Sequence, residues 1–275
     1  MRARLAAWAA RGVRLTYLVD RAYRTFDRIR STLIVALGSD HFFDEYNAVT
    51  YSATESYQPE SIAFRRGLFD WEEEAVTRYF PAPPARILVG GAGGGREPFA
   101  LVDKGYSVVA FDPAEPLVRA MAAAAPSDAT LRAYRGSYAS MPILEAVAGS
   151  NEPLDLRHEP LFDAAIVGWS SFSHLRSDAE RVETLRQFGA ATRGPILVSY
   201  FPDPAPADVP ASGGILRRWL RQRARRRGPS VFSIQIGYYR LLRHSDVEDL
   251  VRQAGLSVVG AERGGNWPYV VVRRG

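Results

Sequence analysis

A run of glycines and a later aspartate are the residues whose types and spacing point most clearly to chemistry. Residues 86–97 read Arg-Ile-Leu-Val-Gly-Gly-Ala-Gly-Gly-Gly-Arg-Glu, so an apolar triplet typical of a buried strand leads into the glycines. Residues 97–104 have the apolar density of a helix, residues 107–111 that of a second strand, and Asp112 lies 21 residues after Gly91. Glycines allow a ligand to lie against the backbone, and a carboxylate at the end of the second strand can accept both ribose hydroxyls. This order predicts a nucleoside-binding βαβ unit.

The spacing of the glycines bears on which nucleoside is bound. Dinucleotide-binding loops usually follow the pattern GxGxxG, but the sixth position counted from Gly91 is Arg96. An arginine there compromises both the close packing of the helix and the approach of a pyrophosphate. A ligand without phosphate therefore suits the loop better, and a nicotinamide-dependent oxidoreductase stays as the alternative.

Three stretches resemble the class I S-adenosylmethionine-dependent methyltransferases: residues 91–97, 105–113 and 162–167. The resemblance extends over about residues 80–275. It implies an α/β, Rossmann-like fold with a seven-stranded, mostly parallel sheet whose last strand is reversed. It also implies S-adenosylmethionine as the cofactor, with the methionine end on the glycine loop and the ribose on the acidic residue. The cofactor-binding residues implied in this way are Gly91, Ala92, Gly93, Gly95, Glu97, Asp112, Pro113, Ser137, Tyr138, Gly168 and Trp169.

Two positions depart from the pattern of that family. Val89 stands where an acidic residue is common just before the loop, and Ser137 stands where an acidic residue is frequent after the third strand. A non-catalytic nucleoside-binding protein is therefore a further alternative.

Methyl transfer needs little from the protein beyond holding the acceptor in line with the sulfonium, because the methyl group is already activated. A base is optional, and His174 is best placed to be one because it follows the predicted fourth strand, residues 161–167, at the ligand edge. His244 is the second choice. The structural alternative is that His174 binds backbone and only shapes its loop. Several aromatic residues line an acceptor pocket or belong to the core: Trp169, Phe172, Tyr200, Tyr238 and Tyr239.

Residues 1–80 are expected to form a helical N-terminal cap or lid. Residues 1–38 are amphipathic and carry eight arginines, which fits packing on the chain's own domain, a homodimer with a twin subunit, or contact with an anionic membrane surface. Residues 40–59 are rich in aromatics, and Tyr46 and Tyr51 are expected either to cover the cofactor or to fix the cap to the core. A further helix is predicted over residues 60–79, before a proline-rich break at 81–84.

The second predicted domain, residues 81–275, continues the alternation of strands and helices. Further strands are expected at residues 130–134, 161–167 and 195–200, and a terminal hairpin is expected from residues 256–262 and 269–273. Residues 203–243 exceed what such a connection needs and are interpreted as a lid-like insertion.

The insertion contains seven arginines in the eleven residues 217–227. Such a run could contact phosphates, yet it is equally typical of a solvated helix. Nucleic-acid base methyltransferases normally show Asn or Asp, then Pro-Pro and an aromatic, after the fourth strand, where this chain has Gly-Trp-Ser-Ser. This disfavours a nucleic-acid substrate, and we expect a small-molecule or lipid-like acceptor methylated on oxygen or nitrogen.

Composition limits the remaining possibilities. The chain has 275 residues, 47% hydrophobic and 24% charged, which is typical of a globular protein. It contains no cysteine, so disulfides, thiolate metal sites and a cysteine nucleophile are excluded. The four histidines have no metal-binding spacing, so no metal site is expected. Neither a signal peptide nor an apolar stretch of transmembrane length is recognised, and we expect a cytoplasmic protein.

Overall fold

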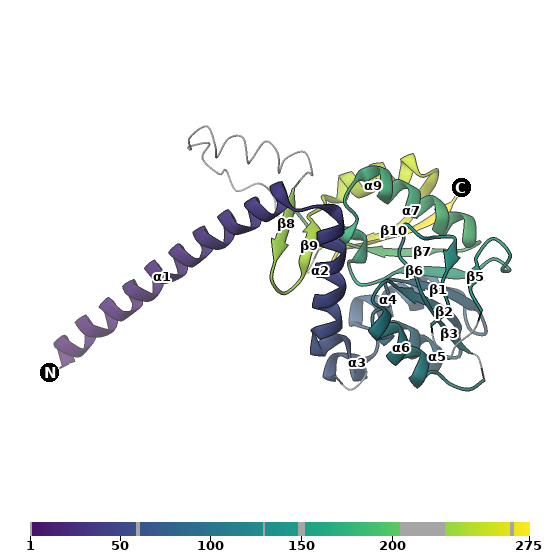
Figure 1. Ribbon diagram of the computed structural model, residues 1–275, viewed down its shortest axis with the longest axis horizontal. Coiled ribbons are helices and arrows are strands. Elements are labelled where there is room, and N and C mark those ends of the chain that lie inside the picture. The colour runs from purple at the N-terminus through teal and green to yellow at the C-terminus, as the bar shows by residue number, and fades with distance from the viewer. Residues whose placement is uncertain (1, 59–60, 129, 148–151, 204–228, 265–266) are drawn as a thin grey trace.

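The centre of the molecule is a seven-stranded sheet. The computed structural model describes residues 2–58, 61–128, 130–147, 152–203, 229–264 and 267–275. Its strands have the spatial order β10-β11-β7-β6-β1-β2-β3 (Figure 1). Their bounds are β1 Arg86–Gly90, β2 Ser107–Asp112, β3 Leu131–Arg135, β6 Ala164–Val167, β7 Ile196–Ser199, β10 Leu256–Glu262 and β11 Tyr269–Arg274.

The sheet is parallel except at one edge. Strands β3, β2, β1, β6 and β7 pair in parallel, whereas β11 is antiparallel to both β7 and β10. The predicted terminal hairpin is therefore correct, and its second strand is the reversed one. The expected mostly parallel sheet with a reversed last strand is confirmed.

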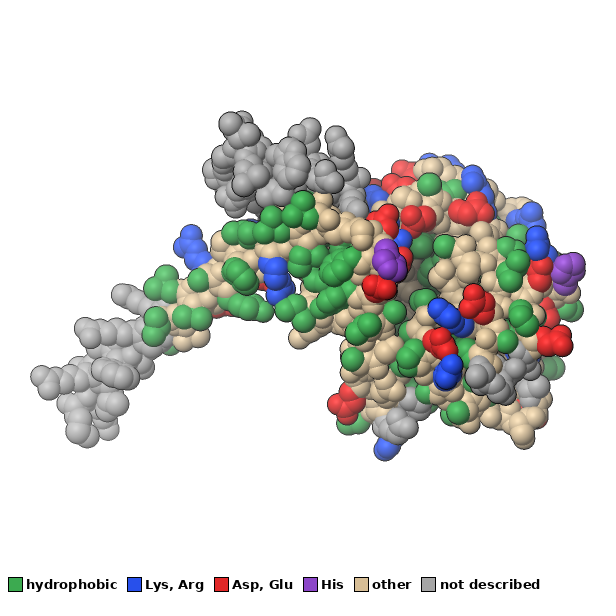
Figure 2. All heavy atoms as spheres, viewed as in Figure 1, with side chains coloured by type: hydrophobic (Ala, Val, Ile, Leu, Met, Phe, Trp, Pro, Cys, Tyr) green, Lys and Arg blue, Asp and Glu red, His purple; other side chains and the backbone are tan. Residues whose placement is uncertain are grey.

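The N-terminal segment forms two consecutive helices. Helix α1, Arg2–Leu37, points away from the sheet, and α2, Asp40–Ala53, follows it after a turn at Gly38 and Ser39 (Figure 1). Ser39 accepts a hydrogen bond from the Phe42 N–H and so caps α2. Hydrophobic side chains lie along the projecting part of α1 (Figure 2).

The insertion supplies a hairpin that packs on these helices. Strands β8, Ser230–Ser233, and β9, Gly237–Arg240, are antiparallel. Phe232 and Tyr238 of this hairpin share a buried cluster with Val35 of α1 and Phe43 of α2. The arginine run at 217–227 lies outside the described residues.

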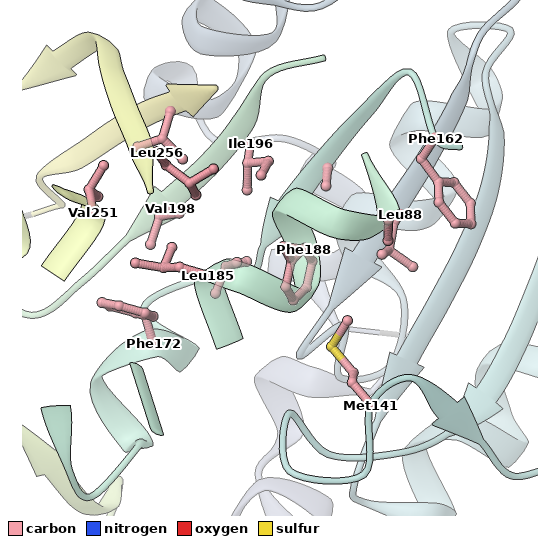
Figure 3. Packing of buried hydrophobic residues seen from close by; sticks show 14 of the residues in the cluster. Leu88, Met141, Phe162, Phe172, Leu185, Phe188, Ile196, Val198, Val251 and Leu256 are labelled. Carbon is pink, nitrogen blue, oxygen red and sulfur yellow. The ribbon is translucent and has the colours of Figure 1, made fainter. Parts of the chain in front are cut away.

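Helices cover both faces of the sheet because neighbouring residues of each strand point to opposite faces. Leu88 of β1 joins one buried cluster, and Ile87 and Val89 join the other. The Leu88 layer is closed by α7, Asp178–Ala191, and α9, His244–Gln253, and Figure 3 shows Phe188 of α7 beside Leu88. The opposite layer is closed by α4 Asp70–Tyr79, α5 Arg96–Asp103 and α6 Glu115–Ala124.

The predicted helix over residues 60–79 is wrong as a single element. It is divided into α3, Ile62–Arg66, and α4, because Gly67 adopts φ +73°, a left-handed conformation that ends α3. Helix α4 precedes the boundary expected at residue 81, yet its Ala75 and Val76 belong to the same buried cluster as the strands. The aromatic stretch after residue 40, for which no helix was predicted, forms α2 and a short 3₁₀ turn, Glu55–Tyr57.

The direction of the crossovers changes at β1. From β1 the chain proceeds through α5 and α6 to β2 and β3 on one side, whereas β6 and β7 lie on the other. In open α/β sheets a crevice forms at the carboxyl ends of the strands at such a switch point. The loops after β1, β2 and β6 are therefore brought together there.

The sheet core should show a clear contrast between a buried and an exposed leucine. Leu88 is fully buried in the central strand, whereas Leu161, in the loop before β6, is 48% exposed. We expect Leu88→Ala to lower the free energy of unfolding by about 2–5 kcal/mol, since it removes buried surface and leaves a cavity. The matched Leu161→Ala should change it by less than about 0.5 kcal/mol. Urea unfolding followed by circular dichroism measures both, and equal effects would contradict the placement of Leu88.

Candidate active site

A cleft of about 680 Å³ opens at the carboxyl ends of β1, β2, β3 and β6. Its walls come from the loops after these strands and from α2. The predicted residues that line it are Gly91, Ala92, Gly93, Glu97, Asp112, Pro113, Ser137, Tyr138, Trp169 and His174.

Two predicted cofactor residues, Gly95 and Gly168, do not line the cleft and support its wall from behind. Gly95 is the residue before α5 and has φ +101°. A Cβ on Gly168 would come within 2.8 Å of the Gly91 carbonyl oxygen. Gly95 is needed for its left-handed backbone conformation, and Gly168 is needed because its backbone lies against that of Gly91. The prediction for both was a direct contact with the cofactor.

The glycine loop presents bare backbone to the cleft. Gly91 and Gly93 have φ of +67° and +54°, a region that side chains rarely adopt. A Cβ on Gly91 would lie 2.7 Å from the Ser171 Oγ, and one on Gly93 would lie 3.3 Å from Cδ1 of Tyr57. A side chain at either position would therefore strain the loop, and it would also crowd Ser171 or Tyr57.

Asp112 holds this loop in place. Its Oδ2 accepts a hydrogen bond from the Gly93 N–H at 2.9 Å, and its Oδ1 accepts one from the Ala114 N–H at 2.8 Å. The side chain is buried, and burial raises the pKa of its carboxyl to about 6, although both backbone donors oppose that shift. Because a carboxylate has about four acceptor positions, Asp112 keeps capacity for a ligand.

A buried ion cluster fixes the far end of the loop. Both terminal nitrogens of Arg96 donate to the Glu72 carboxylate, at 2.6 and 2.7 Å, and one also donates to Glu97 at 2.8 Å. The guanidinium stacks on Phe69, 3.9 Å from the ring centroid. One cation thus faces two carboxyl groups, and burial raises the pKa of Glu72 although the hydrogen bonds from Arg96 oppose that shift. Glu72 was missed by sequence reasoning, because nothing local relates a residue of α4 to the loop.

Aromatic side chains form the wall opposite the sheet. The rings of Tyr51 and Tyr57 are 4.8 Å apart in an edge-to-face contact, and Tyr57 lies 5.7 Å from Trp169. Tyr51 lines the cleft as expected of a lid residue. Tyr46 instead packs on Phe232 and donates to a backbone carbonyl of the hairpin, so it fixes α2 to β8 and β9. Tyr57 lies in the aromatic stretch 40–59 but was not predicted as a site residue.

The aromatic residues expected after β6 and in the insertion divide between cleft and core. Trp169 lines the cleft, and its buried indole N–H finds no acceptor among the described residues. A buried donor without a partner is costly, so a ligand acceptor at this position would be stabilising. Phe172, Tyr200 and Tyr238 are buried in the core, and Tyr239 packs on Phe201 instead.

Ser137 and Tyr138 close the end of the cleft near β3. The Ser137 hydroxyl accepts a hydrogen bond from the Ser140 N–H at 3.2 Å, which stabilises the turn. The Tyr138 hydroxyl is hydrogen-bonded to Ser171, whose own hydroxyl donates to the Gly168 carbonyl at 2.6 Å. Both hydroxyls are thus used within the protein, and the tyrosine ring contributes an apolar surface.

His174 has both ring nitrogens occupied. Nδ1 lies 2.6 Å from the Tyr238 carbonyl oxygen, which can only accept, so Nδ1 carries the proton. Nε2 therefore accepts from the Tyr51 hydroxyl at 2.7 Å. Burial lowers the pKa of His174 to about 4, although the Tyr238 carbonyl opposes that shift, so the ring is neutral near pH 7.

The backbone contact expected in the structural alternative for His174 is present, and so is a link to the cleft through Tyr51. His244, the second choice, does not line the cleft. It contacts the Tyr200 hydroxyl at 2.6 Å and Glu248 at 3.2 Å.

The lowered pKa of His174 predicts a pH-dependent contribution to stability. A histidine whose folded pKa lies below its unfolded value of about 6.5 stabilises the fold fully above pH 6.5, and this contribution is lost as the pH falls towards 4. We therefore expect the stability difference between the wild type and His174→Gln to shrink across this range, by at most about 1.4 kcal/mol per pH unit. Urea unfolding at intervals between pH 4 and 7 measures it. A difference that does not vary with pH would contradict a buried neutral imidazole.

Comparisons with known proteins identify the fold. The sequence matches no profile of a known protein family and no curated protein. Among solved structures, it is similar to the CcbJ methyltransferase from Streptomyces caelestis, with a TM-score of 0.55 and 17% identity over 82% of this chain and 98% of that chain. A protein from Pyrococcus horikoshii gives a TM-score of 0.57 and 17% identity over 82% of this chain and 97% of that chain. A SAM-dependent methyltransferase from Methanosarcina mazei gives a TM-score of 0.52 and 13% identity over 75% of this chain and 97% of that chain.

The chain therefore has the fold of the class I S-adenosylmethionine-dependent methyltransferases.

Proposed function

We propose that the protein is an S-adenosylmethionine-dependent methyltransferase that acts on oxygen or nitrogen of a small-molecule or lipid-like acceptor. The observation that carries this proposal is Asp112, a buried carboxylate that holds a bare glycine loop at the base of a cleft. Two structures of similar fold are described as methyltransferases, which supports the same reaction class here. The cofactor supplies a methyl group already activated on its sulfonium.

The residues around the loop fit such a cofactor. Gly91 and Gly93 keep the loop free of side chains, and Asp112 keeps acceptor positions for the ribose hydroxyls. Glu97 supplies negative charge beside the loop, where Val89 on β1 supplies none. Trp169 offers an indole N–H for which the described residues supply no acceptor. Ala92, Pro113, Ser137 and Tyr138 complete the surface, and Gly95 and Gly168 hold its shape.

Tyr51 and His174 together provide a path for the acceptor's proton. The Tyr51 hydroxyl already donates to Nε2 of His174, so its oxygen can accept a proton from the acceptor as its own proton moves to Nε2. Burial raises the pKa of Tyr51 well above 10, so a free phenolate is disfavoured and the two transfers must be coupled. A hydroxyl that is gaining a methyl group becomes a strong acid, so even a weakly basic imidazole is sufficient.

A small acceptor agrees with the cleft volume of about 680 Å³, which is in the range of small-molecule sites. The aromatic walls favour an apolar body on that acceptor. The absence of the Asn/Asp-Pro-Pro-aromatic sequence after β6 disfavours a nucleic-acid base. A cytoplasmic location stays a prediction from the sequence.

The role of Asp112 can be tested by binding alone. We expect calorimetry to show binding of S-adenosylmethionine and of its demethylated product but not of NADPH. Asp112→Ala should weaken cofactor binding at least tenfold, since two charge-assisted hydrogen bonds of about 1.5–3 kcal/mol each are lost. Asp128→Ala, which removes an exposed carboxylate remote from the cleft, is the matched control and should bind as the wild type does. Tight NADPH binding would favour the oxidoreductase instead, and an unaltered Asp112→Ala affinity would refute the ribose assignment.

The proton path predicts a kinetic effect without a binding effect. We expect Tyr51→Phe to lower the rate of methyl transfer to a responsive hydroxyl acceptor by roughly 100-fold, while the cofactor Kd changes by less than about twofold. Tyr46→Phe is the control, because it removes a hydroxyl from the same helix on the side of the hairpin. Transfer of labelled methyl groups to a panel of phenols, alcohols and amines provides the assay. A weaker cofactor affinity with an unchanged rate would make Tyr51 a lid residue only.

A further inference from the structure

Helix α1 carries an apolar face that the described part of the chain leaves exposed. Most of its hydrophobic residues recur at spacings of three and four, which places them on one face, whereas Val13 and Tyr17 lie on the other side. Leu15, Leu18 and Phe26 are each 63% exposed, and Leu33 is still 36% exposed. The apolar face consists of Leu15, Leu18, Val19, Ala22, Tyr23, Phe26, Ile29, Leu33 and Leu37. Exposed apolar surface of this extent marks an interaction site.

Among the described residues, the contacts of α1 with the chain's own domain lie on a different face, near the C-terminal end of the helix. Val35 is buried against the hairpin, and the Ser31 hydroxyl accepts a hydrogen bond from the Phe232 N–H at 2.9 Å. Neither residue belongs to the apolar face defined above. The rest of the helix extends beyond the body of the molecule (Figures 1 and 2). Packing on the chain's own domain, one of the expectations for this helix, therefore does not account for the apolar face.

The charges of α1 determine which partner fits. Asp20, Arg21, Arg24, Asp27 and Arg28 repeat on the side away from the apolar face. In the sequence of α1, eight arginines stand against two aspartates, a net charge of +6, whereas the whole chain carries only +5. The remainder of the chain therefore has a net charge of −1, even though it includes the seven arginines of residues 217–227.

We propose that α1 lies on the surface of an anionic lipid bilayer, with its apolar face in the membrane interface and its arginines among the lipid headgroups. An amphipathic helix with a basic polar face and aromatic and aliphatic residues opposite is the composition that binds such surfaces. Pairing with α1 of a second copy would bring two helices of charge +6 together, and their repulsion opposes a dimer. No helix in the described part of the chain is long and apolar enough to cross a bilayer, so α1 lies along the surface.

This contact is independent of the proposed function, but it bears on the acceptor. Helix α2 continues from α1 after the turn at Gly38, and its Asn47, Ala48 and Tyr51 line the cleft. Docking of α1 therefore holds the cleft close to the bilayer. The choice of a lipid-like acceptor over a water-soluble one would follow from this, and only that point rests on the methyltransferase proposal.

Vesicle flotation of the full chain tests the proposal. We expect the protein to float with vesicles of phosphatidylglycerol and phosphatidylcholine and to stay unbound with phosphatidylcholine alone. Binding should weaken between 50 and 500 mM salt, since screening reduces attraction to the headgroups. The double variant Leu18→Glu/Phe26→Glu should lose binding at least tenfold, because it places two charges on the apolar face. Leu161→Glu, an equal change at an exposed leucine outside α1, should float as the wild type does.

Light scattering in solution separates the membrane from a second copy. We expect a monomer for both the wild type and the double variant. A wild-type dimer that dissociates in the double variant would overturn the proposal in favour of pairing between copies, and so would flotation that the double variant does not reduce. Cofactor affinity measured without vesicles should be the same in the two proteins. Absence of cofactor binding in both proteins would contradict the proposed function. Absence of flotation with the anionic vesicles would contradict the membrane contact of α1.

Discussion

The buried carboxylate of Asp112 is the constraint on which the site depends. It ends β2, binds the Gly93 N–H of the loop after β1 and the Ala114 N–H that precedes α6, and so joins three elements at one point. Burial disfavours its charge, which the two backbone donors partly offset. A ligand whose hydroxyls donate hydrogen bonds to the same carboxylate would offset the remaining free-energy cost of burying its charge. The site therefore favours such a ligand.

A second buried charge group stabilises the other side of the loop. Arg96 begins α5, directly after the glycines, and its bidentate contact with Glu72 connects α5 to α4 on the same face of the sheet. Removing either partner would leave an uncompensated buried charge, which is strongly destabilising. The loop is thus held at Gly93 by one carboxylate and at Arg96 by another, while its glycines stay free of side chains. Rigid ends and a bare middle are what a close-fitting ligand requires.

The wall opposite the sheet is assembled from segments far apart in the chain. Tyr51 of α2, His174 after β6 and the Tyr238 carbonyl of β9 form one continuous chain of hydrogen bonds. Asn47 reinforces it by binding both the N–H and the carbonyl of Tyr238, at 2.9 and 3.2 Å. This wall of the cleft therefore depends on the hairpin of β8 and β9, and the same hairpin anchors the end of α1. Contact of α1 with a partner would act on an element that is directly connected to the cleft.

Local patterns were sufficient for the parts of this protein that depend on neighbours in the sequence. Apolar runs and turn residues predicted the strands and the terminal hairpin, because strand period and loop geometry are encoded over a few residues. The reversed edge and most of the residues that line the cleft were implied by the resemblance to the methyltransferases. The division at Gly67 was missed because a single left-handed glycine interrupts an otherwise helical pattern. Three features were decided only by the tertiary structure. They are the contact of Glu72 with Arg96, the hydrogen bond between Tyr51 and His174, and the side of α1 that packs on the hairpin. Each depends on which distant segments meet, and no spacing in the sequence records that.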